Sequence, residues 1–338
     1  MHLQNIHHHD TASIKEDKRL DNDKSARDID AHRSPKIPQT EHTSVTETNI
    51  HHHFDAICHN LREYLTKKGV TAVDMDNAVK EHTEILERHL GMIIPPEDSR
   101  NAALIGALWS SGLFIYFPTN VIIDSPIYSN YGNNDTTTNQ FERSLIIADE
   151  SAEVHYIEGC ISPTQTHVKG SLHSLVTELV ANKYSKIRYT TLQNWNKDVY
   201  NLASKRAYVY ESATIDWKDG NIGSKLTKDY SSIYLLGRNA FVEIALLAFA
   251  GSSQHQDISM QTVHLAPRTT AKISRKSINK SYGKTTFEGL LHVSKGAIGS
   301  KTDIQFDALV FDESSGVNTY PCLEVNEENS VNSYGCSY

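Results

Sequence analysis

The sequence predicts a mainly β protein whose strands are preceded by a small helical region. From Ala102 onward, short runs rich in β-branched and aromatic residues recur, and clusters of Gly, Asn, Asp and Ser separate them. No amphipathic helices come between these runs, so a sandwich, a barrel and a solenoid all fit the pattern. Periodicity alone does not choose among the three.

Residues 1–53 form a polar segment in which acidic and basic residues are mixed and large apolar residues are few. Such a segment buries too little apolar surface to offset the entropy of ordering, so we expect a disordered arm. The arm is rich in histidine, with triplets at His7–His9 and His51–His53. Irregular histidine runs on a disordered arm hold no fixed ligand geometry, which disfavours a specific metal role.

Residues 54–98 are expected to be helical. Phe54–Thr66 has helical character, and Val73–Leu90 carries apolar residues at steps of three and four. Gly91 suits the end of the second helix, and the prolines at 95 and 96 close the region. The β-rich core is then expected to occupy residues 99–338.

The core is expected to contain many short strands. They are predicted at Leu113–Phe117, Ser144–Ala148, Glu153–Ile157, Lys186–Trp195, Ala207–Tyr210, Ile233–Leu236, Gln261–Leu265, Thr270–Ser274 and Asp303–Phe311. Phe241–Gly251 is predicted to be a buried strand, although it carries Glu243. Residues 218–223, Lys-Asp-Gly-Asn-Ile-Gly, have turn composition and are predicted to separate strands.

Composition excludes several function classes. The formal charge is −8 with a pI near 6.1, and the densest basic stretch, Arg268–Lys284, is predicted to be a solvated face, so we expect no nucleic-acid binding. No apolar run approaches the roughly 18 residues that span a bilayer, and no signal peptide is visible. Four dispersed cysteines fit a reducing, cytoplasmic setting.

Cys160 is the first candidate for chemistry. It ends the run Q-F-E-R-S-L-I-I-A-D-E-S-A-E-V-H-Y-I-E-G-C (140–160) and directly follows Gly159. A thiol accepts sulfur as a persulfide, or binds iron, when it can ionise and be reached. The alternative is an inert small hydrophobic residue in a β core.

Gln193 and Trp195 form a second group with Lys205. Residues 187–195 alternate, so Gln193 and Trp195 share one strand face with Ile187 and Tyr189. Placing them on an apolar face buries polar groups that need partners. Pairing with each other or with nearby backbone would meet that need, so this pattern leaves a purely structural role open.

These motifs resemble the SufB/SufD family of iron–sulfur cluster assembly proteins. The resemblance rests on residues 140–160, S-L-H-S-L-V-T-E-L-V (171–180), Y-T-T-L-Q-N-W (189–195) and V-Y-N-L-A-S-K-R (199–206), and extends from about Val79 to about Val325. It implies a right-handed parallel β-helix with helical pieces at both ends. It also implies that Cys160, in Y-I-E-G-C-I-S-P, receives sulfur, and that Gln193, Trp195 and Lys205 line an interior sulfur path. A buried lysine with a lowered pKa would stabilise a thiolate or persulfide there.

The chain departs from the family pattern in three places. Phe306 stands where the scaffold cysteine is expected, and since it alternates with Ile304 and Ala308, its ring is predicted to fill the interior. Gly132-Asn-Asn134 keeps the asparagine of a family Arg-x-Asn pair and loses the cation. After Val325 the family continues into a helical region that docks the SufC ATPase, which we expect to be largely absent here, so SufC docking is expected to be weak.

The resemblance therefore implies a non-enzymatic scaffold that accepts sulfur and carries a transient iron–sulfur cluster. Its implied partners are SufD or another SufB-like chain, the SufC ATPase and a cysteine desulfurase or sulfur-transfer protein, with no nucleic acid and no membrane. Phe306 leaves cluster binding open. The alternative is a structural or regulatory partner of Suf proteins that binds no cluster. A carbohydrate-active β-helix enzyme is disfavoured, because the sequence has no suitable cluster of carboxylates.

Overall fold

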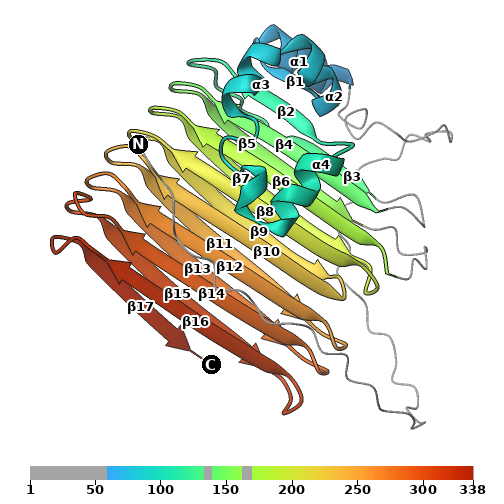
Figure 1. The fold of residues 1–338 in the computed structure, drawn as a ribbon, viewed down its shortest axis with the longest axis vertical. Helices are drawn as coiled ribbons and strands as arrows, with labels where there is room; N and C mark the ends of the chain where they lie inside the picture. Colours follow the sequence, from blue (N-terminus) through green and yellow to red (C-terminus); the bar gives the residue numbers. More distant parts are fainter. Residues whose placement is uncertain (1–58, 133–138, 162–169, 338) are drawn as a thin grey trace. The chain divides into compact units, whose positions relative to one another are not determined.

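The computed structural model describes residues 59–132, 139–161 and 170–337; the side chains of 59–62, 130–132 and 161 lie outside that description. The described chain forms two parallel β-sheets of nine and eight strands. From β2 onward, consecutive strands alternate between the sheets, so each pair makes one turn of a parallel β-solenoid (Figure 1). The predicted mainly β, parallel β-helical fold is thus confirmed. The arm expected at 1–53 and Cys58 lie outside the described residues.

The first sheet contains, in spatial order, β1 (Thr71–Asp74), β2 (Leu113–Phe117), β4 (Gln140–Ala148), β6 (Leu172–Ala181), β8 (Tyr200–Val209), β10 (Leu226–Leu235), β12 (His255–His264), β14 (Lys284–Val293) and β16 (Gly316–Val325). The second contains β3 (Ile127–Gly132), β5 (Glu153–Ile161), β7 (Lys186–Trp195), β9 (Thr214–Gly223), β11 (Phe241–Ala250), β13 (Thr270–Asn279), β15 (Lys301–Val310) and β17 (Val331–Ser337). Only β1 and β2 pair antiparallel.

One row of solenoid corners is built on residues with positive φ that are not glycine. Ser151, Tyr184, Ser212, Asn239 and Arg268 have φ between 53° and 62°. The N–H of each donates to a carbonyl of the next turn, and the bond from Tyr184 to Glu211 is 3.0 Å long. These stacked bonds satisfy the corner backbone and offset the cost of the left-handed conformation.

The helical region differs from its prediction. It contains α1 (His59–Lys67), α2 (Met75–Glu81), α3 (Thr83–His89), a 3-10 turn η1 (Pro96–Asp98) and α4 (Arg100–Leu108). The single helix expected at Val73–Leu90 is therefore wrong, because the chain leaves helical geometry at His82 and β1 precedes α2. Helix α4 occupies residues where β-rich runs were expected, and the Ser99 hydroxyl caps it by accepting the Ala102 N–H at 3.1 Å. None of the described helices has the length and apolar character that crossing a membrane requires.

Helices α2, α3 and α4 cover the outer face of the first sheet near β2, β4 and β6 (Figure 1). Their buried side chains form an apolar cluster with strand residues that include Phe114, Leu145 and Val176. The Glu178 carboxylate binds the loop that follows α3: it accepts a hydrogen bond from the Ile94 N–H at 2.8 Å and forms an ion pair with Arg143 at 3.0 Å. This cluster is separate from the interior between the two sheets.

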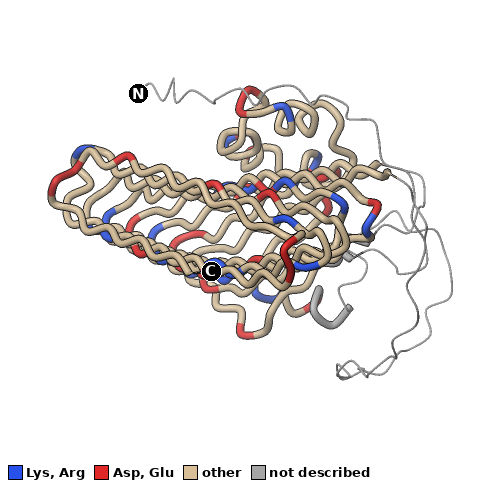
Figure 2. Tube along the Cα trace, turned by 90° about the horizontal axis from the view of Figure 1, so that it is seen from below, with Lys and Arg blue, Asp and Glu red and all other residues tan. Residues whose placement is uncertain are grey.

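Alternate residues of the strands point into the interior, and two predictions fail there. Residues 218–223 belong to β9 rather than to a turn, with Asp219 and Asn221 buried. In the basic stretch Arg268–Lys284, Arg275 is only 2% exposed, so that stretch is not wholly a solvated face. Elsewhere acidic and basic residues are interspersed along the described strands (Figure 2). Phe241–Ala250 is a strand as predicted, but it is buried on one face only and Glu243 is exposed.

Candidate functional site

Cys160 lies on the interior side of β5, where it has no exposed surface. Strand register places Gln193 of β7 beside it and Asn221 of β9 next in the same row. The neighbouring row runs from Glu158 through Thr191 to Asp219. Two adjacent interior rows therefore carry polar side chains instead of the apolar residues usual in a β core.

The Cys160 thiol faces a carboxyl group rather than a cation. Its Sγ lies 3.9 Å from Glu158 Oε1. Burial raises the pKa of Cys160 well above its ordinary value, and the charges of Glu158 and Glu142 raise it further. Cys160 is therefore a protonated thiol at neutral pH, and sulfur acceptance would require a group that removes its proton.

Glu158 is 1% exposed. Burial raises the pKa of this carboxyl to about 7, although Lys205 and the hydrogen bond from Tyr189 act in the opposite direction. The Tyr189 hydroxyl donates to Glu158 Oε2 at 3.1 Å, and the other carboxyl oxygen, Oε1, faces the Cys160 thiol. The Glu158 carboxyl thus exchanges its proton near neutral pH, and its Oε1 lies within hydrogen-bond range of the Cys160 thiol.

Lys205 of β8 crosses the interior and pairs with two carboxylates. Its Nζ donates to Asp219 at 2.5 Å and to Asp229 at 2.8 Å. Burial acts to lower the pKa of Lys205, but the two aspartates outweigh it, so the pKa is raised. The expectation of a lysine with a lowered pKa is therefore wrong. Lys205 remains a cation, and Asp219 and Asp229 hold it between β9 and β10.

Gln193 and Trp195 are buried on the predicted face of β7. Gln193 accepts a hydrogen bond from Asn201, whose side-chain oxygen lies 2.8 Å from His173 Nδ1. The ring centroids of His173 and Trp195 are 4.3 Å apart. Gln193 Nε2 and Trp195 Nε1 have no hydrogen-bond partner among the described residues. The two side chains therefore do not hydrogen-bond to each other.

The structure brings Cys160, Gln193 and Lys205 into one interior region and adds residues that the sequence did not single out. Sequence reasoning gave no site role to Tyr189 or His173, and it missed Glu142, Asn201, Asp219, Asn221 and Asp229. Period-two alternation along β8 and β10 would have indicated Asn201 and Asp229, because both occupy inward positions that alternate with more exposed ones.

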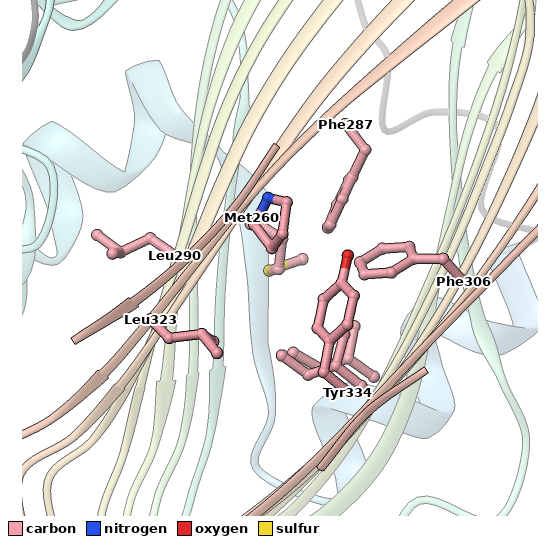
Figure 3. A pocket seen from close by; sticks show the side chains of 10 residues that line it. Met260, Phe287, Leu290, Phe306, Leu323 and Tyr334 are labelled. Carbon is pink, nitrogen blue, oxygen red and sulfur yellow. The ribbon is translucent and has the colours of Figure 1, made fainter. Parts of the chain in front are cut away.

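The opposite end of the described interior is aromatic. Phe306 of β15 is 4% exposed, and its ring centroid lies 4.4 Å from that of Phe287 and 5.2 Å from that of Tyr334. These rings point towards one another between the two sheets, beside Met260 (Figure 3). The cavity that they line is about 10 Å³, the space that one water molecule needs. The prediction that Phe306 fills the interior is confirmed.

Arg275 extends across the same interior from β13. Register places it directly beside Phe306, and its guanidinium carbon lies 4.3 Å from the Phe287 ring centroid. Its one described hydrogen bond runs to the Thr286 carbonyl at 3.4 Å, and no described carboxylate lies within ion-pair distance. Burial lowers the pKa of Arg275 to about 9.

The other described cysteines are exposed. Cys322 lies on β16, and Cys336 lies on β17 directly beside Phe306 in register. Within the described residues, no three His, Cys, Asp or Glu side chains are arranged to hold a metal ion. The Gly132–Asn134 segment extends beyond the described residues, so the lost arginine of the family pair has no structural account.

By its fold and its site, the chain is a parallel β-solenoid protein with a buried thiol in a polar, charged interior. The family model for the SUF system FeS cluster assembly SufBD core domain matches residues 130–338, and the model for the SufBD N-terminal region matches residues 41–128. The chain therefore belongs to the SufBD family of iron–sulfur cluster assembly proteins.

Two relatives show how far the similarity extends. The chain is 41% identical to the iron–sulfur cluster assembly protein SufB of Bacillus subtilis (strain 168) over 293 residues, which is 87% of this chain and 63% of that protein. It is also 41% identical to an iron–sulfur cluster assembly SufBD family protein of Staphylococcus aureus (strain MRSA252) over 289 residues, 86% of this chain and 62% of the relative. The chain thus spans about 62% of the length of the curated relatives that it matches.

Proposed function

We propose that this chain accepts sulfur at Cys160 during iron–sulfur cluster assembly and holds it in the polar interior. One observation carries this proposal: the polar interior is concentrated around the thiol, and several of its groups lack partners. Besides Gln193 Nε2 and Trp195 Nε1, Glu142 Oε1 and Asn221 Oδ1 are buried without a hydrogen-bond partner among the described residues. Unsatisfied buried groups cost stability, so a functional reason for them is expected.

Each residue has a distinct part in this proposal. Cys160 forms the persulfide, and the amide of Gln193, next to it in register, donates to the added sulfur. Trp195 supplies a second free N–H. Lys205 remains charged and lowers the cost of negative charge on sulfur, since its charge acts to lower the pKa of Cys160. The polar region extends from β5 to β10, and its rows then continue into Leu246 and Ala248.

The proposed setting follows from the family and from the name of the B. subtilis relative. A cysteine desulfurase or a sulfur-transfer protein supplies the sulfur, and SufD or another SufB-like chain pairs with this one. The transient cluster is cargo, and ATP hydrolysis belongs to the SufC partner rather than to this scaffold. Four cysteines dispersed along the sequence fit a reducing, cytoplasmic setting.

Persulfide labelling tests the sulfur acceptor. After incubation with a cysteine desulfurase and cysteine, the wild-type chain should carry a persulfide, and Cys160→Ser should lose it while keeping its circular dichroism spectrum. Cys322→Ser, which removes an exposed thiol, is the matched control and should label as the wild type does. Equal labelling of wild type and Cys160→Ser would show that Cys160 is only a packing residue.

Phe306 favours a second candidate, a structural or regulatory partner that binds no cluster. Its ring occupies the interior where the family resemblance implies a thiol, and phenylalanine neither binds iron nor carries a persulfide. Anaerobic reconstitution with iron and sulfide, followed by visible absorbance, separates the two candidates. Cluster absorbance in the wild type supports the scaffold. Absorbance that appears only in Phe306→Cys supports the structural partner.

A further inference from the structure

A buried thiol that is to accept sulfur must first lose its proton, and the interior around Cys160 makes this difficult. The thiol has no exposed surface, so bulk water does not take the proton directly. Burial and the carboxylates of Glu158 and Glu142 raise the pKa of Cys160. A proton acceptor inside the protein is therefore needed, and it must lie within reach of Sγ.

Glu158 has the required position. Its Oε1 is 3.9 Å from Cys160 Sγ, and its other oxygen is held by the Tyr189 hydroxyl at 3.1 Å. The Tyr189 ring is itself locked in place, with its centroid 5.1 Å from that of Trp217 in an edge-on contact. Both Glu158 and Cys160 point inward from β5, two residues apart, so the strand itself sets their separation.

The charges around Glu158 also favour this role. The groups that face it are Glu142 of β4, Tyr189 of β7, Lys205 of β8 and Asp219 of β9. The one lysine among them is paired with aspartates, and no described cation lies within ion-pair distance of Glu158. A carboxylate without a cation in a buried site takes up a proton at little cost, because its neutral form suits the interior better.

We propose that Glu158 is the proton acceptor for Cys160, an inference that rests on sulfur acceptance at that thiol. The thiol proton moves from Sγ to Glu158 Oε1, and the thiolate attacks the outer sulfur of a donor persulfide, R–S–SH. A new S–S bond forms at Cys160 and the S–S bond of the donor breaks. The leaving thiolate R–S⁻ takes the proton from Glu158, so the products are Cys160–S–SH and R–SH. Sulfane sulfur is transferred without net oxidation or reduction.

This proton transfer keeps the interior charge constant. Before it, the negative charge lies on Glu158; after it, the charge lies on sulfur, and the neutral carboxyl group is then a hydrogen-bond donor to the thiolate. A raised pKa of about 7 for Glu158 matches this task, since both protonation states are populated at neutral pH. Glu158 touches the reacting sulfur and is in this sense a catalytic residue.

The test uses the full chain with Cys58, Cys322 and Cys336 replaced by serine, so that Cys160 is the one thiol. Two reagents are applied across the pH range: inorganic polysulfide as sulfur donor, and methyl methanethiosulfonate as a small thiol reagent that needs only the thiolate. In the wild-type background both rates should rise with a midpoint near pH 7 and reach a plateau above it. In Glu158→Gln both rates at pH 7 should fall about 100-fold and the plateau should disappear. Tyr189→Phe should move the midpoint to higher pH, because it removes a bond that stabilises the carboxylate.

The opposite result has a clear meaning. If Glu158 only repels the thiolate, removing its charge should make Glu158→Gln react as fast as the wild type or faster, and this outcome would overturn the inference. Glu153→Gln, on the exposed side of the same strand, is the matched control and should leave both profiles unchanged. If polysulfide does not modify Cys160 but methyl methanethiosulfonate still shows the Glu158 dependence, the proposed function fails and the inference stands. Failure of both reagents at every pH overturns both.

Discussion

Among the described residues, two cations are buried in the interior of the solenoid, in contrasting surroundings. Lys205 lies between Asp219 and Asp229, at 2.5 Å and 2.8 Å, within the polar region beside Cys160. Arg275 lies among the aromatic rings near Phe306, with one long hydrogen bond and no described ion pair. The comparison teaches that burial alone does not define a functional charge. The region around Lys205 pairs its buried charge with carboxylates. The aromatic cluster of Phe287, Phe306 and Tyr334 instead surrounds a cation, Arg275, that has no described ion pair.

Breaking the charge network around Lys205 should have the largest effect. Lys205→Met leaves two carboxylates buried without a cation, and we expect a loss of about 5 kcal/mol of unfolding free energy at pH 7, since two unpaired charges remain. Burial raises the pKa of Asp229 to about 6 even with Lys205 present, and removal of that cation raises it further, so the variant takes up a proton and the loss should shrink as the pH falls towards about 6. Urea denaturation at neutral and acidic pH measures the stability loss and its dependence on pH. Lys218→Met, an exposed lysine on the neighbouring strand, should change stability by no more than about 0.5 kcal/mol.

Substitutions in the aromatic cluster around Phe306 should reduce stability somewhat less. Phe306→Ala opens a cavity and should cost about 3–4 kcal/mol, towards the lower end for a buried phenylalanine because the adjacent β17 is exposed and can relax. Phe306→Cys keeps part of the volume and should cost less. Thermal unfolding of the two variants beside the wild type provides the measurement. An unchanged melting temperature for Phe306→Ala would contradict the packing around this ring.

Glu158 should make stability depend on pH in a defined direction. Burial raises its pKa from 4.5 to about 7 in the folded state, so the folded chain binds more protons than the unfolded chain between these values. The stability that this group contributes is fully present below about pH 4.5 and is lost as the pH rises through about 7, a change of about 3 kcal/mol. Glu158→Gln should flatten this part of the stability curve. A variant curve parallel to that of the wild type would show that Glu158 is not protonated in the fold.

Removing the Arg275 cation should have the smallest effect on stability, and in the opposite direction. Arg275→Met replaces a poorly compensated buried charge by an apolar side chain of similar length, and should leave stability unchanged or raise it by about 1 kcal/mol. Lys276→Met, its exposed neighbour on β13, should be neutral. Differential scanning calorimetry of both variants is sensitive enough for this comparison. A loss of several kcal/mol in Arg275→Met would reveal an anionic partner for this guanidinium.

Alternation is a local signal, and it predicted the mainly β class and the inward face of β7. The solenoid itself was implied only by the family resemblance. It failed where interior chemistry overrides local propensity. Residues 218–223 have turn composition, yet β9 continues through them because Lys205 and Thr191 satisfy Asp219 from other strands. Arg275 lies among exposed lysines in sequence, and only strand register shows that it points inward. The corners at Tyr184 and Arg268 have positive φ without glycine, so the glycine that usually marks such a conformation is absent there.

Helix α4 could have been predicted from the sequence. Ser99 followed by R-N-A-A-L-I-G-A-L is an N-cap before a run of helix-favouring residues, and the observed cap bond from Ala102 confirms that signal. In the candidate site, Cys160, Gln193, Trp195 and Lys205 were named from motifs, but their connections were not. The contacts of Lys205 with Asp219 and Asp229 join residues that are 14 and 24 positions apart on three different strands. Such contacts depend on the register of the solenoid, which no local pattern encodes.

The central claim, that the buried thiol and not an exposed one accepts sulfur, is tested most directly by locating the added sulfur. The wild-type chain is incubated with a cysteine desulfurase and cysteine, persulfides are trapped by alkylation, and peptides are mapped by mass spectrometry. The account predicts added sulfur on the peptide that contains Cys160, with Cys322 and Cys336 unmodified although both are exposed. Sulfur found on Cys322 or Cys336 while Cys160 remains a free thiol would contradict it.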